Sequence, residues 1–244
     1  MGDTYLNLVN KAIRKVNDIE LTSATFAGAS GFSEMVKDAI NDSIRRVNQD
    51  QHKWPFNYTE TTQVLTADTA VYSFPSDFKV AKWDSFMIQK DSSLNAPARN
   101  LSYIDYDEWI SKFKEQDNSL AVGDGGLPSM VYRTPNNKFG LSTLPDAAYT
   151  VAYSYWAVPD DLSAYGDTTS IPIAFNHVIV EGALYYIYLF RSNETAANMA
   201  NSRFKEGLKH MRTILLNPDT YAWDTRSTGE LTRNSPRYAA ARPI

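Results

Sequence analysis

Acidic side chains gather most closely in the run Asp105-Tyr-Asp-Glu108. Two carboxylates can serve as general acid and general base when they lie in contrasting environments. This run instead opens an expected amphipathic helix, where the positive end of the helix dipole favours negative charge. The spacing Ser102-x-x-Asp105 resembles a capping box, with Asp in place of Glu or Gln. We therefore interpret these carboxylates as helix-capping groups and not as a catalytic pair.

The other candidates for chemistry are isolated along the chain. His52, His177 and His210 show no metal-ligand spacing such as H-E-x-x-H, and His177 adjoins the apolar stripe of an expected helix, as a structural histidine does. The absence of Cys excludes disulfides, zinc–thiolate sites and thiol nucleophiles. The segment Gly123-Asp-Gly-Gly126 lacks the alternating Asp and Asn ligands of a calcium loop. We therefore expect no catalytic residue, no metal, no cofactor and no enzyme activity.

Adjacent arginines, Arg45 and Arg46, could form a phosphate-binding patch on an expected helix. Asp38, Asp42 and Asp50 surround them, which favours a mixed, solvated helix face instead. The formal net charge of the chain is −4, so no global basic field attracts it to nucleic acid or anionic lipid.

Helical periodicity marks both ends of the chain. Apolar residues recur at spacings of three and four over residues 4–17 and from the expected cap Ser33 to about residue 51, where Trp54-Pro55 forces extended backbone. The same pattern returns from Pro172 and again after a cap at Ser192 or Asn193. Because an amphipathic pair alone cannot bury its apolar faces, we expect the two pairs to pack as a four-helix bundle.

Between the helix pairs the hydrophobic period changes to two, which indicates strands. We expect strands at residues 63–66, 71–74 and 80–88, and an antiparallel meander over residues 126–159. In that meander large side chains alternate with small ones, so one face should be core and not a binding surface; the large residues are Tyr149, Val151, Tyr153 and Tyr155. One helix, with Ile104, Trp109, Ile110 and Phe113 on its buried side, interrupts the strands.

The predicted fold class is α+β: a four-helix bundle from N- and C-terminal helix pairs, an inserted antiparallel β domain and an extended C-terminal arm. The expected boundaries are residues 1–57 and 171–217 for the helix pairs, 58–160 for the β domain and 218–244 for the arm. The N-terminus shows no signal-peptide pattern, and the most apolar run, Gly182–Phe190, is too short to span a bilayer. We expect no membrane association.

The C-terminal arm combines arginines with aromatic residues and has little periodicity. Such a terminus is typical either of a disordered tail or of a segment that orders on a partner. The aromatic residues favour the second interpretation, and the candidate docking residues are Tyr221, Trp223, Arg226, Arg233, Arg237, Tyr238 and Arg242.

Four segments, in order and spacing over residues 4–217, resemble the head-to-tail adaptor proteins of short-tailed phages, of the tail tubular protein A type. A helix pair ends in Trp54-Pro55-Phe56, and Tyr72-Ser-Phe74-Pro75-Ser-Asp77-Phe78 is similar to the family's Y-x-L-P-x-D-F with Phe in place of Leu. Gly126-Leu127-Pro128 precedes Val131-Tyr132, and Leu141-Ser-Thr-Leu144-Pro145-Asp146 leads into Tyr149-Thr-Val151-Ala-Tyr153 and Pro159.

The resemblance implies a structural virion protein: a homo-oligomeric ring of about twelve copies, a dodecamer, that links the portal vertex to the tail. It implies that the arm docks on the portal protein, and that the other partners are neighbouring copies, a downstream tail or nozzle protein, and DNA passing through the lumen. The location implied is the head–tail interface of a virion assembled in the host cytoplasm. An alternative is a carbohydrate- or receptor-binding tail accessory module, which the Tyr and Trp content of the β region favours.

Overall fold

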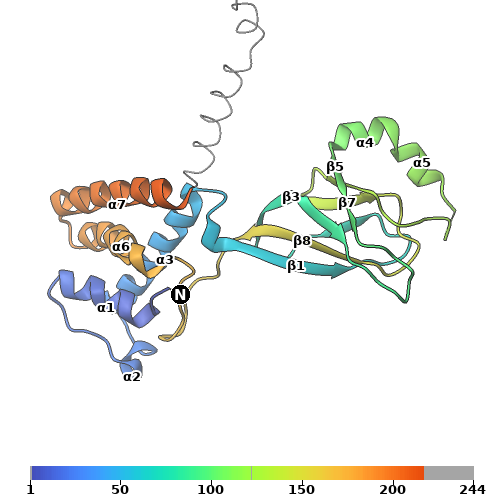
Figure 1. Cartoon of the computed structure of the whole chain (residues 1–244). Coiled ribbons are helices and arrows are strands. Elements are labelled where there is room, and N and C mark those ends of the chain that lie inside the picture. Colours follow the sequence, from blue (N-terminus) through green and yellow to red (C-terminus); the bar gives the residue numbers. More distant parts are fainter. Residues whose placement is uncertain (1, 122, 217–244) are drawn as a thin grey trace, which may run out of the picture. The chain divides into compact units, whose positions relative to one another are not determined.

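The computed structural model describes residues 2–121 and 123–216, and these residues form a mixed α+β protein. They divide into two compact units, one of residues 2–50 and 162–216 and the other of residues 51–161. The first unit is helical, and the second contains both β-sheets of the described chain (Figure 1). The α+β class predicted from the sequence is therefore confirmed.

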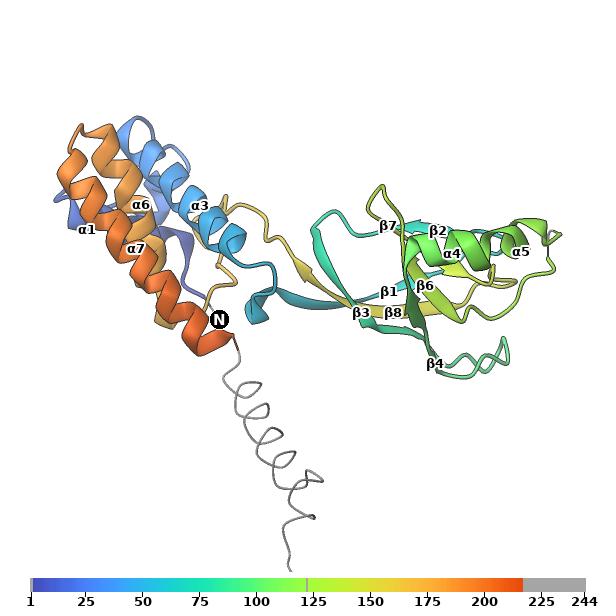
Figure 2. The same cartoon turned by 90° about the horizontal axis from the view of Figure 1, so that it is seen from above.

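The helical unit is organised around its most apolar helix. Its described helices are α1 (Tyr5–Lys15), α2 (Ser23–Phe26), α3 (Phe32–Asp50), α6 (Asn176–Phe190) and α7 (Glu194–Leu215), and a 3-10 turn, η2 (Ile173–Phe175), precedes α6. Helix α6 contacts α1, α3 and α7, and Figure 2 shows α3, α6 and α7 side by side. Since α6 is surrounded by three helices, it is buried along most of its length and needs no polar stripe.

The stretch of residues 173–190 has the length and the apolar composition of a helix that could cross a membrane. It is the one such stretch in the described chain. The core helix of a globular unit passes the same test, and α6 lies in the interior of the helical unit. Packing against other helices therefore accounts for the apolar composition of this stretch.

The helix ends follow the sequence in part. Thr4 Oγ1 accepts a hydrogen bond from the Asn7 N–H at the start of α1. Asn193 Oδ1 accepts one from the Ala196 N–H at the start of α7, so of the two expected alternatives, Ser192 and Asn193, the cap is Asn193. The expectation that Ser33 caps the second long helix is wrong, because α3 begins one residue earlier. Helix α2, with a Thr22–Thr25 capping box, lies between the first two predicted helices, where no helix was predicted.

The second unit contains two four-stranded sheets, with strand orders β1-β8-β3-β4 and β2-β7-β6-β5. Helices α4 (Tyr106–Lys112) and α5 (Lys114–Ser119) and a 3-10 turn, η1 (Pro55–Asn57), complete it. The strands are β1 (Tyr58–Val64), β2 (Val71–Ser73), β3 (Phe78–Ile88), β4 (Arg99–Asn100), β5 (Ser102–Ile104), β6 (Met130–Arg133), β7 (Lys138–Ser142) and β8 (Thr150–Ala157).

The strand pairing corrects three predictions. Strands β6, β7 and β8 do not form a meander, because β8 pairs with β1 and β3 in the other sheet. The β region is not purely antiparallel, since β5 and β6 run parallel. The first strand covers residues 58–64 and not 63–66. The first two errors concern which strands pair with each other, and the period-two pattern does not contain that information.

Both sheets share one aromatic core. Phe86 of β3 stacks on Tyr153 of β8 at 4.6 Å between ring centroids, and Phe139 of β7 lies edge-on to Phe86 at 5.4 Å. The large face of β8 is buried, as predicted from the alternation of Tyr149, Val151, Tyr153 and Tyr155. That prediction is confirmed: these tyrosines are core residues and not a binding surface.

The buried tyrosines make the second unit sensitive to alkali. Burial raises the pKa of Tyr153 to about 12, and burial with a hydrogen bond to Asp77 raises the pKa of Tyr155 to about 12. Unfolded tyrosines ionise near pH 10. We therefore expect the free energy of unfolding to be maintained below about pH 10 and to fall as pH rises towards 12.

Absorbance titration of tyrosinate combined with denaturant unfolding at each pH measures this effect. Replacement of Tyr155 by Phe should reduce the alkaline loss of stability, whereas replacement of the exposed Tyr165 by Phe should leave it unchanged. Equal pH profiles for the native protein and the Tyr155→Phe variant would contradict the prediction.

Close packing around α6 gives a second prediction. A Cβ atom at Gly182 would lie 2.2 Å from Ser43 Oγ and 2.8 Å from Phe204 Cδ2. We expect Gly182→Ala to lower the free energy of unfolding by about 1–3 kcal/mol, because a packed core must shift to accept the methyl group. Urea unfolding followed by helical circular dichroism measures the loss. Gly166→Ala, with nothing within 4 Å of the new Cβ, is the matched control, and a similar loss in both variants would disprove the packing explanation.

Candidate functional site

The carboxylates of the Asp105–Glu108 run lie at the start of α4. Asp105 occupies the N-cap position without a side-chain capping bond, and Ser102 belongs to β5, so the predicted capping box is wrong. Asp107 and Glu108 lie in the first helical turn, which confirms their placement near the positive end of the dipole. Glu108 accepts a hydrogen bond from Lys112 Nζ at 2.7 Å on the exposed surface. These groups stabilise a helix and do not face a cleft.

A buried carboxylate that the sequence reasoning missed holds α4 and α5 on the second sheet. Asp117 accepts hydrogen bonds from Trp109 Nε1 at 2.9 Å and from Ser142 Oγ of β7 at 2.8 Å. Trp109 is buried as predicted, whereas Ile110, predicted on the same buried side, is exposed. Because Ser142 is distant in sequence, no local pattern indicates this contact.

The two adjacent arginines of α3 have different surroundings. Arg45 is exposed and donates to Asp42 at 2.8 Å, as expected for a mixed, solvated face. Arg46 departs from that expectation: its guanidinium lies 4.4 Å from the Phe204 ring centroid and donates to Asn201 Oδ1 at 3.0 Å. It therefore joins α3 to α7 by a cation–π contact and a hydrogen bond.

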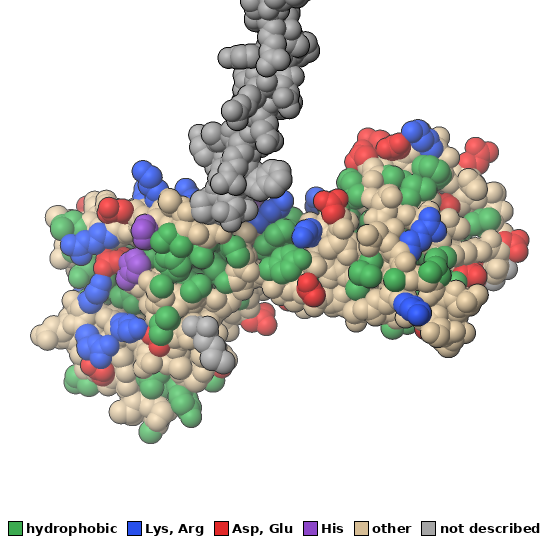
Figure 3. Space-filling view, viewed as in Figure 1, with side chains coloured by type: hydrophobic (Ala, Val, Ile, Leu, Met, Phe, Trp, Pro, Cys, Tyr) green, Lys and Arg blue, Asp and Glu red, His purple; other side chains and the backbone are tan. Residues whose placement is uncertain are grey.

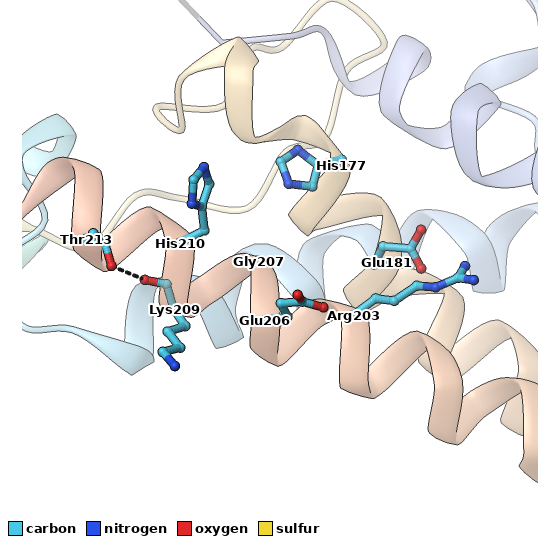
Figure 4. A pocket seen from close by; sticks show the side chains of 8 residues that line it. All are labelled: His177, Glu181, Arg203, Glu206, Gly207, Lys209, His210 and Thr213. Carbon is cyan, nitrogen blue, oxygen red and sulfur yellow. Dashed lines mark hydrogen bonds between the residues drawn. The ribbon is translucent and has the colours of Figure 1, made fainter.

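Charged residues instead converge in a groove of about 520 Å³ between α6 and α7. His177 of α6 and His210 of α7 lie on its two sides, and Arg203 extends along it in Figure 4. Both histidines are exposed, and His177 Nδ1 lies 3.2 Å from the Ala174 carbonyl oxygen. The groove is lined mainly by His177, Glu181, Arg203, Glu206, Lys209 and His210.

A second hollow, of about 440 Å³, adjoins the first at His177 and lies between α1 and α6. It adds the cations of α1, and Figure 3 shows Lys and Arg side chains around the two histidines on this face. We use the term basic groove for both hollows together, whose cations are Lys11, Arg14, Lys15, Arg203 and Lys209. Two carboxylates, Glu181 and Glu206, also line it, so its charge is predominantly positive.

Ion pairs fix the α1 side of the basic groove. Lys15 Nζ donates to Glu181 of α6, and Lys11 Nζ donates to Asp3. The buried Asp3 carboxylate also accepts from Asn176 Nδ2 at 3.0 Å, which ties the start of the described chain to α6. Arg203 and Lys209, on the α7 side, enter no ion pair with the residues that the structure describes.

The residues that the structure describes form no metal centre. Across residues 2–121 and 123–216, no group of three or more His, Asp or Glu side chains is placed to hold a metal ion. The seven candidate docking residues of the arm lie outside the described residues: Tyr221, Trp223, Arg226, Arg233, Arg237, Tyr238 and Arg242. The basic groove is therefore the candidate site that the described part of the chain offers.

An α+β chain of two units, with a charged groove and exposed apolar side chains, is typical of a protein that binds other macromolecules. The model of the SU10 adaptor protein family matches residues 3–234, and the chain belongs to this family. It is thus a phage adaptor protein and a structural component of the virion. A comparison with curated proteins gave no match.

The Asp3 network predicts a loss of stability in acid. Burial alone raises the pKa of Asp3, but the hydrogen bonds from Lys11 and Asn7 and the charge of Lys11 outweigh it and hold the pKa below its usual value. The resulting stabilisation is present above pH 4, where an unfolded Asp is ionised, and is lost as pH falls through the lower pKa of the folded state.

We expect Asp3→Asn to lower the free energy of unfolding at neutral pH by about 1–3 kcal/mol and to flatten its decline in acid. Denaturant unfolding of the helical unit between pH 7 and about pH 2 measures both effects. Asp38→Asn removes an exposed carboxylate from α3 and serves as the control. Parallel pH profiles for the native protein and the Asp3→Asn variant would exclude this role for Asp3.

Proposed function

We propose that the chain is a head-to-tail adaptor whose copies form a ring between the portal vertex and the tail. The observation that carries the proposal is the SU10 adaptor family match, which extends through both compact units. The sequence resemblance to adaptors of the tail tubular protein A type points to the same role. The proposed mechanism is geometric: rigid units pack side by side, and the protein catalyses no reaction and holds no cofactor.

In this proposal the four long helices act as one four-helix bundle, and residues 51–161 act as an inserted domain. Support comes from the chain path, since the helical unit is left after residue 50 and re-entered at residue 162. Further support comes from α6, which contacts the other three long helices. Each unit has its own core, so each can present a fixed surface to neighbouring subunits.

The proposed ring contains about twelve copies at the head–tail interface of the virion, assembled in the host cytoplasm without a membrane. Obligate interfaces of this kind usually bury about 2,000 Å² or more. Large apolar side chains that are exposed in the described chain, such as Ile19, Ile173 and Phe190, support this expectation. The proposed neighbours are the portal protein, a downstream tail or nozzle protein, and DNA passing through the lumen.

On the portal side, residues 218–244 are the proposed docking arm. The arginines of the arm would pair with acidic portal residues, and its aromatic residues would fill apolar pockets. The alternative of a carbohydrate- or receptor-binding module loses its main support, because the tyrosine face of β8 is buried and cannot stack on a sugar ring.

Removal of residues 219–244 tests the docking arm. We expect the shortened chain to fold normally but to co-sediment with portal protein at least tenfold less than the full chain, because the proposed contacts are lost. A full-length variant with Gln at positions 226, 233, 237 and 242 separates charge from length, and its binding should respond less to salt than that of the native chain. Unchanged co-sedimentation of the shortened chain would refute arm docking.

A further inference from the structure

An exposed apolar cluster lies at the C-terminal end of α6, at the opposite end of this helix from His177. Leu189 and Phe190 are exposed by 43% and 61%, respectively. The Phe32 ring, at the start of α3, lies 6.3 Å from the Phe190 ring. We call Phe32, Leu189 and Phe190 the apolar knob. Such a cluster of exposed apolar side chains marks a protein–protein contact more often than a free surface.

One arginine holds the knob rigid. The Arg191 guanidinium lies 4.4 Å from the Phe32 ring centroid and donates to the Val16 carbonyl oxygen at 3.1 Å and to Asp18 at 2.7 Å. These contacts join the end of α1, the start of α3 and the end of α6. A knob that is already ordered loses little conformational entropy when it binds.

Two carboxylates without an ion-pair partner in the described chain adjoin the knob. Glu34 lies in the first turn of α3 and Glu194 in the first turn of α7, beside the knob. Both are exposed, and neither forms an ion pair with the residues described in the structure. On the groove side, Arg203 and Lys209 likewise have no carboxylate partner within the described chain. Glu34 and Glu194 are therefore complementary in charge to Arg203 and Lys209.

The two surfaces also match in form. Gly207, which packs against Val178 of α6, lies where the two helices meet, and the imidazoles of His177 and His210 line the groove (Figure 4). A volume of about 520 Å³ is sufficient for an aromatic side chain and the carboxylates beside it. The Phe190 ring can enter this hollow, while Glu194 and Glu34 approach the cations of α7.

From these observations we propose that the apolar knob of one copy docks in the basic groove of the next copy. The contact deepens the proposed function, on which it rests, by assigning residues to the ring interface. His177 lies in the first turn of α6 and Phe190 is its last residue, so about 20 Å of helix separates these two residues. Because the surfaces are different and lie apart on one unit, the contact is head-to-tail and can repeat around a ring.

Charge exchange across the contact tests the proposal. Full-length variants Glu194→Lys and Lys209→Glu are each mixed with portal protein, and portal-bound rings are counted by electron microscopy. We expect the number of rings to fall by about tenfold or more in each single variant, because like charges then face each other. The double variant Glu194→Lys, Lys209→Glu should recover ring formation, because opposite charges face each other again.

Two further variants complete the design. Phe190→Ser removes the centre of the knob from an exposed position and should abolish rings while the helical circular dichroism is unchanged. Lys205→Glu makes the same charge change on the exposed surface of α7 outside the groove, and it should form rings as the native chain does.

The outcomes separate this contact from the function on which it rests. Native rings together with normal rings of Phe190→Ser and Lys209→Glu would overturn the contact and leave the adaptor ring intact. Failure of the double variant to recover would also overturn the contact. The absence of rings from the native chain on portal protein would overturn both the contact and the proposed ring.

Discussion

Burial of α6 is the constraint on which the helical unit depends. An apolar helix of this length must be covered on all sides, and α1, α3 and α7 supply that cover. Close approach requires Gly182 opposite Ser43 and Phe204, and Gly207 opposite Val178. The same packing leaves the ends of α6 at the surface, and these ends form part of the basic groove and of the apolar knob. The core of this unit thus also positions its interaction surfaces.

The β unit depends on a different interaction, the contact between aromatic rings of its two sheets. Phe86 and Tyr153 meet from neighbouring strands of one sheet, and Phe139 joins them from the other sheet. Such ring pairs stabilise beyond the area that they bury, and their preferred geometries fix the position of one sheet on the other. An aromatic core of this kind makes a scaffold for the surfaces of the unit.

Local patterns predicted the individual elements well where one side of an element faces the core. The cap at Asn193 and the buried face of β8 were both predictable from residue types and spacing. The sequence did not predict contacts between segments that are distant along the chain. The pairing of β8 with β1 and β3, the parallel β5–β6 pair and the burial of Asp117 depend on contacts that no local period encodes.

The sequence by itself determined the class of protein: α+β, without cysteine chemistry, with two helical regions around a region of strands and with motifs of phage adaptors. The tertiary structure alone decided where the charges meet. Lys15, His177 and Lys209 come from three separate helices, and a groove exists only once α1, α6 and α7 pack together. The physical reason is that hydrophobic periodicity records which face of each element is buried, whereas a shared surface depends on which elements become neighbours.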